Sequence, residues 1–145
     1  MVLMPGPKFH LAISVNNLEQ TRKFYTEIIG ASEGRSDTSW MDFNFFGHQL
    51  VAHLDRTNDQ NSKTLRNHVD GDLVPIPHFG AILDHEDWES LINRLIQSEW
   101  PFELEPHVRF QGLPGEQWTM FLRDPSGNAL EFKFFENPGQ LFATE

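Results

Sequence analysis

The stretch Asp124-Pro125-Ser126-Gly127-Asn128-Ala129-Leu130-Glu131-Phe132-Lys133-Phe134-Phe135 predicts a tight turn that leads into a β-strand. Its proline, its glycine and the short polar residues Asp124 and Asn128 are of the types that such turns favour. Along the strand Glu131 lies on the side opposite Leu130, Phe132 and Phe134, because successive side chains alternate. A carboxylate buried there without a partner costs free energy. Glu131 therefore reaches water or faces a positive group, and we hypothesise that this group is a metal ion.

The composition limits which partners the chain can have. It has 145 residues, enough for one domain with a substantial core, and a formal net charge of -10, which argues against a nucleic-acid partner. The first residues lack the pattern of a signal peptide, and no apolar run approaches the roughly 18 residues of a membrane span. We therefore expect a cytoplasmic protein. The sequence contains no cysteine, so histidines and carboxylates would have to hold any metal.

The pattern of predicted elements occurs twice along the chain. Each half has a strand, a helix with an amphipathic stripe and three further strands. The strands are expected at about 9–15, 31–37, 40–46 and 48–54, and again at about 78–83, 103–110, 117–123 and 128–135. The predicted fold class is α+β, with two βαβββ modules, about 8–55 and 78–136, in a single domain spanning 1–145. Their curled mixed sheet would surround a metal-binding cleft.

Turn and cap residues mark where the predicted elements begin and end. Asn17 and Asp84 are expected to cap the two helices at their N-termini, and Gly30 to end the first one. The second helix should stop after Trp100, before a proline. The stretch 56–77 is polar and has no clear periodicity, so it predicts a long loop that is either a lid or a connector.

Three side chains from separate strands form the candidate site. His10 and His78 open equivalent strands on the face opposite the helix, and Glu131 lies on the last strand of the second module. His53 lies on the last strand of the first module, in what we take to be the equivalent position. Two histidines and one carboxylate form a facial triad, which favours Fe(II), with Mn, Ni or Zn as alternatives.

Each of these residues also has a purely structural interpretation. A histidine at a strand start is often only a satisfied polar residue, and Glu131 could pair with Lys133 or Arg123 instead of a metal. Matched histidines in two modules favour the ligand interpretation. Other polar residues are expected to be structural or solvated, namely His48, His68, His85, His107, Arg109 and Glu116.

A set of motifs, in order along the chain, carries a family resemblance. They are Phe9-His10-Leu11-Ala12-Ile13-Ser14-Val15, Phe24-Tyr25 before Ile29-Gly30, Pro77-His78-Phe79-Gly80, and Asp124 to Asn128 leading to Glu131. With these motifs the chain resembles the vicinal oxygen chelate superfamily, which includes glyoxalase I, extradiol dioxygenases, and fosfomycin and bleomycin resistance proteins. Two further stretches, Phe46-Gly47-His48-Gln49 with His53 and Pro114-Gly115-Glu116-Gln117, are similar to a bacterial subgroup described as extradiol-dioxygenase-like.

The resemblance implies a divalent metal held by His10, His78 and Glu131, a small-molecule substrate and a homodimer. Glyoxalase-type members usually have a fourth ligand, a glutamate, at the end of the first module, and the stretch 49–53 contains none. His53 would then be a fourth ligand or a catalytic acid–base residue. The extradiol enzymes have a tyrosine near the substrate, whereas Tyr25 lies on the apolar stripe of a helix.

The interpretation that best fits these expectations is an extradiol-dioxygenase-like oxidoreductase acting on a small aromatic or vicinal-oxygen substrate. The alternatives are a glyoxalase-type lyase or isomerase and a non-catalytic, bleomycin-resistance-like binding protein.

Overall fold

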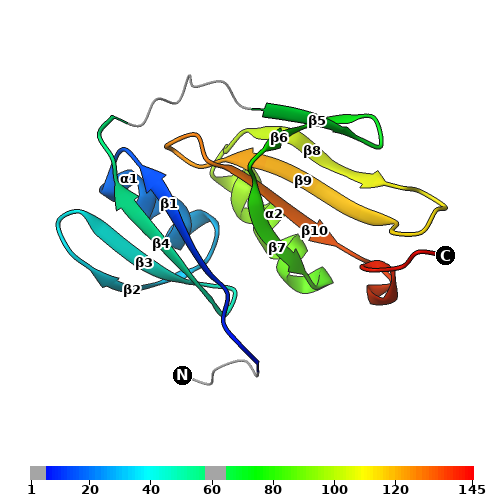
Figure 1. Cartoon of the computed structure of the whole chain (residues 1–145), viewed down its shortest axis with the longest axis horizontal. Coiled ribbons are helices and arrows are strands. Elements are labelled where there is room, and N and C mark those ends of the chain that lie inside the picture. Colours follow the sequence, from blue (N-terminus) through cyan, green and yellow to red (C-terminus); the bar gives the residue numbers. More distant parts are fainter. Residues whose placement is uncertain (1–5, 58–64) are drawn as a thin grey trace. The chain divides into compact units, whose positions relative to one another are not determined.

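The computed structural model describes residues 6–57 and 65–145, which fall into two compact units. The first unit comprises residues 1–61 and the turn 124–128, and the second comprises 62–123 and 129–145. Each unit has its own four-stranded mixed sheet, so the predicted α+β class is confirmed (Figure 1). No helix in the described ranges is both long and apolar enough to cross a membrane.

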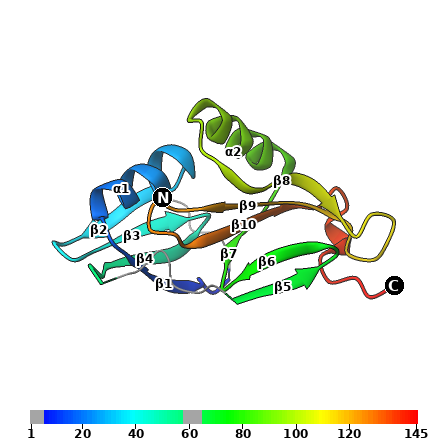
Figure 2. The same cartoon turned by 90° about the horizontal axis from the view of Figure 1, so that it is seen from above.

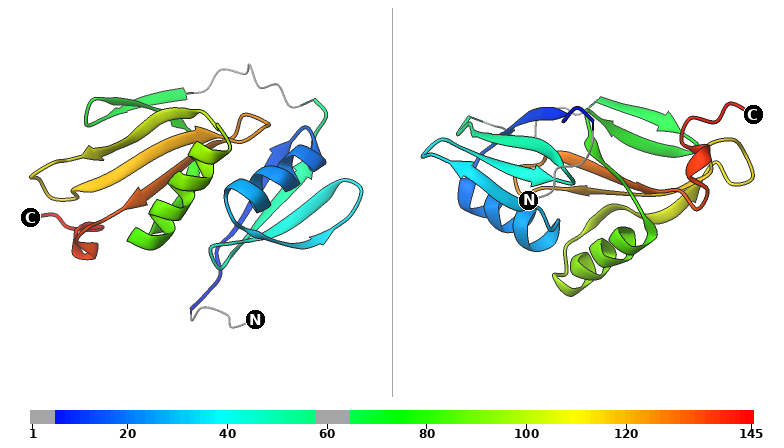
Figure 3. Two further views of the ribbon diagram at one scale, coloured as in Figure 1. Left: turned by 180° about the vertical axis from the view of Figure 1, so that it is seen from behind. Right: turned by 90° about the horizontal axis from the view of Figure 1, so that it is seen from below.

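The first unit follows the predicted order of a strand, a helix and three strands. The elements are β1 (His10–Val15), α1 (Leu18–Lys23), η1 (Phe24–Ile28), β2 (Ser32–Ser36), β3 (Trp40–Phe45) and β4 (His48–Leu54). The sheet has the order β1-β4-β3-β2, with β1 and β4 parallel and the other pairs antiparallel. Helix α1 lies across one face of this sheet (Figure 3).

The second unit repeats this topology and adds a hairpin. Its elements are β5 (Leu65–Val69), β6 (Asp72–Ile76), β7 (Phe79–Leu83), α2 (His85–Gln97), β8 (Phe102–Arg109), β9 (Gln117–Arg123), β10 (Ala129–Phe134) and η2 (Pro138–Gln140). The main sheet has the order β7-β10-β9-β8, which matches the first sheet strand for strand and confirms the duplication. Helix α2 covers one face, and β5 and β6 lie over the other (Figure 2).

The helix ends follow from local chemistry. The side chains of Asn17 and Asp84 each accept a backbone N–H three residues on, at 2.9 and 2.8 Å, so both predicted caps are confirmed. Helix α1 passes into the π-helical turn η1, an interruption that the periodicity did not reveal. Helix α2 ends at Gln97, before the predicted end. Glu99 there adopts a left-handed conformation (φ 54°), and the Trp100 N–H bonds to the Leu95 carbonyl, which closes the helix.

The predicted loop 56–77 is wrong for residues 65–76, which form the antiparallel hairpin β5–β6. Asp70 and Gly71 both have positive φ angles, 45° and 85°, as a two-residue hairpin turn requires. The Asp-Gly pair is a hairpin signal, but β5 is largely polar and β6 contains a proline, and these features hid the alternation. Residues 58–64 of the predicted loop lie outside the described residues, and the lid remains a prediction.

The hairpin is attached to β8 by charged contacts. Arg66 of β5 lies 3.0 Å from Glu103, which also pairs with Arg123 of β9. At the hairpin turn, the Asp70 carboxylate accepts the Phe110 N–H at 2.6 Å. The hydrogen bond from Arg123 is the main reason that the pKa of Glu103 is lowered from its ordinary value, and Arg66 adds to this effect.

The turn 124–128 is held in the first unit by a buried hydrogen bond. The Tyr25 hydroxyl donates to Asp124 at 2.9 Å, and neither side chain is exposed. The other carboxylate oxygen of Asp124 accepts the backbone N–H groups of Ser126 and Asn128. Burial raises the pKa of Asp124, although these hydrogen bonds oppose the rise. The only tyrosine is therefore a structural residue.

Replacing Tyr25 by Phe should destabilise the protein. The change leaves a buried carboxylate with one donor fewer, which should lower the free energy of unfolding by about 1–3 kcal/mol. Urea denaturation measures this loss. In a double-mutant cycle with Asp124→Asn, the two losses should not add, because both remove the same hydrogen bond. Strictly additive losses would show that the bond contributes nothing.

The stability of the protein should also fall as the pH falls through the pKa of Glu103. Because this pKa is lowered in the folded state, its contribution is complete above the ordinary value of 4.5 and is lost at lower pH. Urea denaturation from neutral pH to below pH 4.5 should show a shallower loss for Glu103→Gln than for the wild type. The Glu103→Gln/Arg123→Met double variant should lose stability with falling pH as shallowly as Glu103→Gln does. A steeper loss in the double variant would show that another titrating group causes the effect.

Candidate functional site

Glu131 lies in the middle of β10, with β7 on one side and β9 on the other. Its register partners are Gly80 and Phe121. Phe134, which alternation places on the opposite face of β10, packs against Trp88 of α2. The Glu131 side chain therefore points away from α2, and it is 5 % exposed. A Cβ atom at Gly80 would collide with the Glu131 carbonyl, so glycine permits this close strand pairing.

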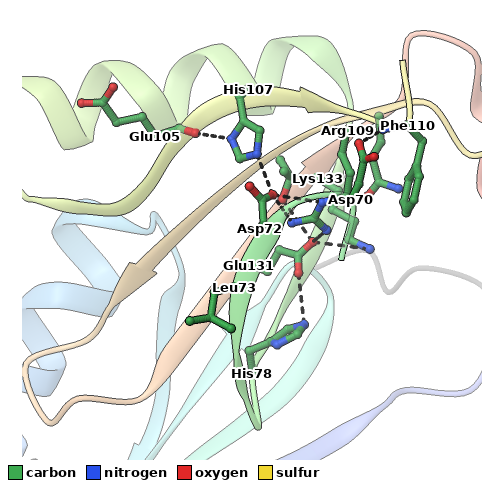
Figure 4. Close-up of polar contacts among 12 residues, drawn as sticks. Asp70, Asp72, Leu73, His78, Glu105, His107, Arg109, Phe110, Glu131 and Lys133 are labelled. Carbon is green, nitrogen blue, oxygen red and sulfur yellow. Dashed lines mark hydrogen bonds and ion pairs between the residues drawn. The ribbon is translucent and has the colours of Figure 1, made fainter. Parts of the chain in front are cut away.

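One oxygen of Glu131 is held by donors from β8, β9 and β10 itself. Oε1 lies 3.3 Å from an Arg109 nitrogen, 3.1 Å from the Thr119 hydroxyl and 3.4 Å from the Lys133 ammonium (Figure 4). The positive groups that the buried carboxylate required are therefore present in the protein itself. Lys133 was one of the expected alternatives, whereas Arg123, the other, pairs with Glu103.

The second oxygen of Glu131 faces His78. Oε2 lies 3.0 Å from His78 Nε2, and His78 Nδ1 lies 2.7 Å from the Pro75 carbonyl oxygen. Both ring nitrogens thus face acceptors, and the bond to Glu131 is the main reason that the pKa of His78 is raised. Burial alone would raise the pKa of Glu131, but His78 and the nearby cations outweigh it and lower this pKa. Both pKa shifts favour the imidazolium–carboxylate form of the pair.

A second carboxylate, on the hairpin, completes the cluster. Oδ2 of Asp72 lies 2.9 Å from Arg109 and 2.7 Å from His107. Arg109 is only 3 % exposed, so the expectation of a solvated residue beside a turn is wrong. His107 is also part of this network, which agrees with the structural role expected for it. Alternation along β8 places both on one face, and this was the available signal for them.

A small pocket adjoins the His78–Glu131 pair on the same face of the sheet. It has a volume of about 190 Å³ and is lined by His78, Gly80, Ala81, Ile82, Glu131 and Lys133. The pocket therefore combines the candidate ligands and one cation with an apolar wall.

His10 and His53 belong to the first unit. His10 is exposed, and its Nδ1 lies 2.8 Å from the amide oxygen of Gln49. The register shows which residue corresponds to Glu131. In the first unit, Ala12 lies two residues after His10 and pairs with Val51. In the second unit, Gly80 lies two residues after His78 and pairs with Glu131. Val51, and not His53, is thus the equivalent of Glu131, and the predicted equivalence is wrong. His53 is exposed on β4.

The predicted ligands are divided between the units, with His10 in the first and His78 and Glu131 in the second. Of the three, the second unit brings His78 and Glu131 together. Within either unit, the described side chains include no group of three or more histidines and carboxylates that could hold a metal ion. The three-ligand site remains a prediction.

Replacing Arg109 by Met should strongly destabilise the second unit. The variant keeps most of the side-chain volume but leaves the buried Glu131 and the partly buried Asp72 without their shared cation, a change that typically costs about 3–5 kcal/mol. Urea denaturation provides the measurement, and Arg56→Met, at an exposed position, provides the matched control. Equal stability of the two variants would contradict the role given to Arg109.

Comparison with known proteins places this fold and site in context. Residues 9–132 match the model of the Glyoxalase/Bleomycin resistance protein/Dioxygenase superfamily. A glyoxalase/bleomycin resistance protein/dioxygenase from Alicyclobacillus acidocaldarius is 30% identical, with 97% of this chain and 98% of that chain covered and a TM-score of 0.78. No curated protein matches the sequence significantly.

More distant solved structures share the fold. A fosfomycin resistance protein from Listeria monocytogenes is 14% identical, with 96% and 100% of the two chains covered and a TM-score of 0.69. A lactoylglutathione lyase from Agrobacterium tumefaciens is 20% identical, with 97% and 99% covered and a TM-score of 0.64. The match over residues 9–132, together with the duplicated βαβββ topology, shows that this chain belongs to the glyoxalase/bleomycin resistance/dioxygenase superfamily, also called the vicinal oxygen chelate superfamily.

Proposed function

We propose that the chain is a divalent-metal-dependent enzyme whose metal is held by His10, His78 and Glu131. The main support is the way in which the second unit presents two ligand atoms. Three donors hold Oε1 of Glu131, and the Pro75 carbonyl holds Nδ1 of His78, which leaves Oε2 and Nε2 facing each other at 3.0 Å. Carboxylate oxygen and imidazole nitrogen are both atoms that would bind a divalent metal.

The donor set suits a divalent ion. A histidine whose other ring nitrogen bonds to a carbonyl is the usual form of a metal-bound imidazole, and binding replaces the proton on Nε2. His10 has the same arrangement, with Gln49 as its acceptor. Two imidazoles and one carboxylate favour Fe(II), while Mn, Ni and Zn also accept this set.

Within the superfamily, we propose extradiol-dioxygenase-like chemistry. Val51 occupies the position of the first module that corresponds to Glu131, and its side chain offers no ligand atom. This favours three protein ligands and open coordination sites over the four-ligand set of glyoxalase-type enzymes. When bound, Fe(II) would supply a Lewis acid for two neighbouring substrate oxygens and a site for O₂.

The protein's own side chains would bind and orient the substrate. Ala81 and Ile82 give the pocket an apolar wall for a small aromatic or vicinal-oxygen compound, and Lys133 faces it with a positive charge. His53 is the proposed acid–base residue. We further propose a cytoplasmic homodimer, on the strength of the family resemblance. A sedimentation mass equal to the 16.8 kDa of one chain would contradict the dimer.

Protein purified without added metal should contain close to one equivalent of Fe, Mn, Ni or Zn by elemental analysis. His78→Ala should lose most of it, because the change removes a ligand and leaves Glu131 without its partner. His85→Ala, which replaces an exposed histidine of α2, is the matched control and should keep the metal. Equal metal content in all three proteins would remove His78 from the site.

Oxygen consumption then separates the candidate reactions. Fe(II)-loaded protein should consume O₂ with a catechol as substrate, and His53→Ala should lower the rate with little loss of metal. Consumption of the methylglyoxal–glutathione adduct without O₂ uptake would instead indicate a glyoxalase-type lyase or isomerase. A protein that binds an aromatic drug but no stoichiometric metal would be a binding protein.

A further inference from the structure

A chain of hydrogen-bonded side chains runs behind His10 in the first unit. Gln49 is the register partner of His10 on the adjacent strand, and its amide oxygen lies 2.8 Å from His10 Nδ1. The amide nitrogen of Gln49 lies 3.2 Å from Oδ2 of Asp42 on β3. This series of hydrogen bonds, here called the relay, therefore crosses three neighbouring strands, β1, β4 and β3, on one face of the sheet.

Asp42, at the far end of this series of hydrogen bonds, is held in a fixed position. Asp42 is 8 % exposed, and its Oδ1 accepts the backbone N–H of Arg35 from β2. A Cβ atom at position 34 would collide with the same carboxylate, so Gly34 leaves the room that Asp42 occupies. Asp42 is thus held by the backbone of the neighbouring strand and presents its second oxygen to Gln49.

The direction of the hydrogen bonds follows from Asp42. Its carboxylate oxygens act as acceptors, so the NH₂ group of Gln49 must face it. The carbonyl oxygen of Gln49 then faces His10, and the nitrogen opposite that oxygen must be the one that carries hydrogen. In the neutral ring, His10 Nδ1 is therefore the N–H donor, and Nε2 carries the lone pair.

We propose that Gln49 and Asp42 are positioning residues that hold His10 in the Nδ1–H tautomer, with Nε2 ready to bind a metal ion. This inference rests on the proposed function, because it takes His10 as a ligand. In the second unit, the Pro75 carbonyl oxygen faces Nδ1 of His78, so Nδ1 would keep its hydrogen when Nε2 gives up its own to bind a metal. The two modules thus reach one arrangement by different means, a side-chain relay in the first and a backbone acceptor in the second.

Two substitutions test the relay without touching a ligand. Gln49→Leu removes the acceptor, and His10 should then adopt the Nε2–H tautomer that free histidine prefers in water. Asp42→Asn should act at a distance. The Arg35 N–H would still donate to the side-chain oxygen of the new asparagine, so the new NH₂ group would face Gln49. The Gln49 amide would then turn over, so that its oxygen accepts from this NH₂ group. His10 Nδ1 would then face a donor and lose its hydrogen. Gln20→Leu, at an exposed position on α1, is the matched control.

The readout is the ring ¹⁵N spectrum of His10 in metal-free protein at about pH 9, well above the usual histidine pKa of about 6.5. We expect a protonated Nδ1 in the wild type and in Gln20→Leu, and a protonated Nε2 in Gln49→Leu and Asp42→Asn. A wild-type spectrum with Nε2 protonated, or one that neither substitution changes, would overturn the relay.

Mn(II) binding, followed by EPR of the free ion, tests the consequence for the metal. Loss of such a supporting residue typically weakens metal binding by about 10- to 100-fold, and both relay variants should show this loss while Gln20→Leu does not. Unchanged Mn(II) affinity in variants whose tautomer has reversed would overturn the positioning role. A wild-type protein that binds no Mn(II), Fe(II) or Zn(II) would refute the proposed function, and the ¹⁵N spectra would still decide the relay.

Discussion

The second unit depends on one constraint, a carboxylate buried in the centre of a sheet. Glu131 is compatible with that position only because Arg109, Lys133 and His78 surround it. Arg109 is itself buried, so it needs the second carboxylate that Asp72 provides from the hairpin. Opposite charges therefore alternate from the hairpin across β8 to β10. The result is a division of roles within Glu131, in which one oxygen is anchored and the other is directed at His78.

Much of the fold could be predicted because its signals are local. The caps at Asn17 and Asp84, the turn before Glu131 and the alternation in the strands each depend on a few neighbouring residues. The cluster around Glu131 could not be predicted in the same way. Arg109 lies 22 residues from Glu131 and 37 residues from Asp72, so their meeting depends on strand register and on the placement of the hairpin.

The wrong prediction that His53 corresponds to Glu131 also arose because strand register cannot be read from the sequence. Repetition of strands and helices along the sequence identifies which strands correspond, but it does not give the pairing register. A shift of two residues keeps a side chain on the same face, so alternation accepts Val51 and His53 equally well. Only the pairing of His10 with Gln49 distinguishes them. The histidines that open β1 and precede β7 could be found from sequence because they stand at matched strand starts.

The valine at position 51 has a consequence for how this protein could change over evolutionary time. Two of the valine codons become glutamate codons by a single base substitution. A glutamate at position 51 would occupy the register position that Glu131 occupies in the second module. The first module would then have a histidine and a glutamate at the same two positions as the second. A point mutation thus separates an asymmetric pair of modules from a symmetric one, and such short mutational distances offer a route by which related folds can exchange one chemistry for another.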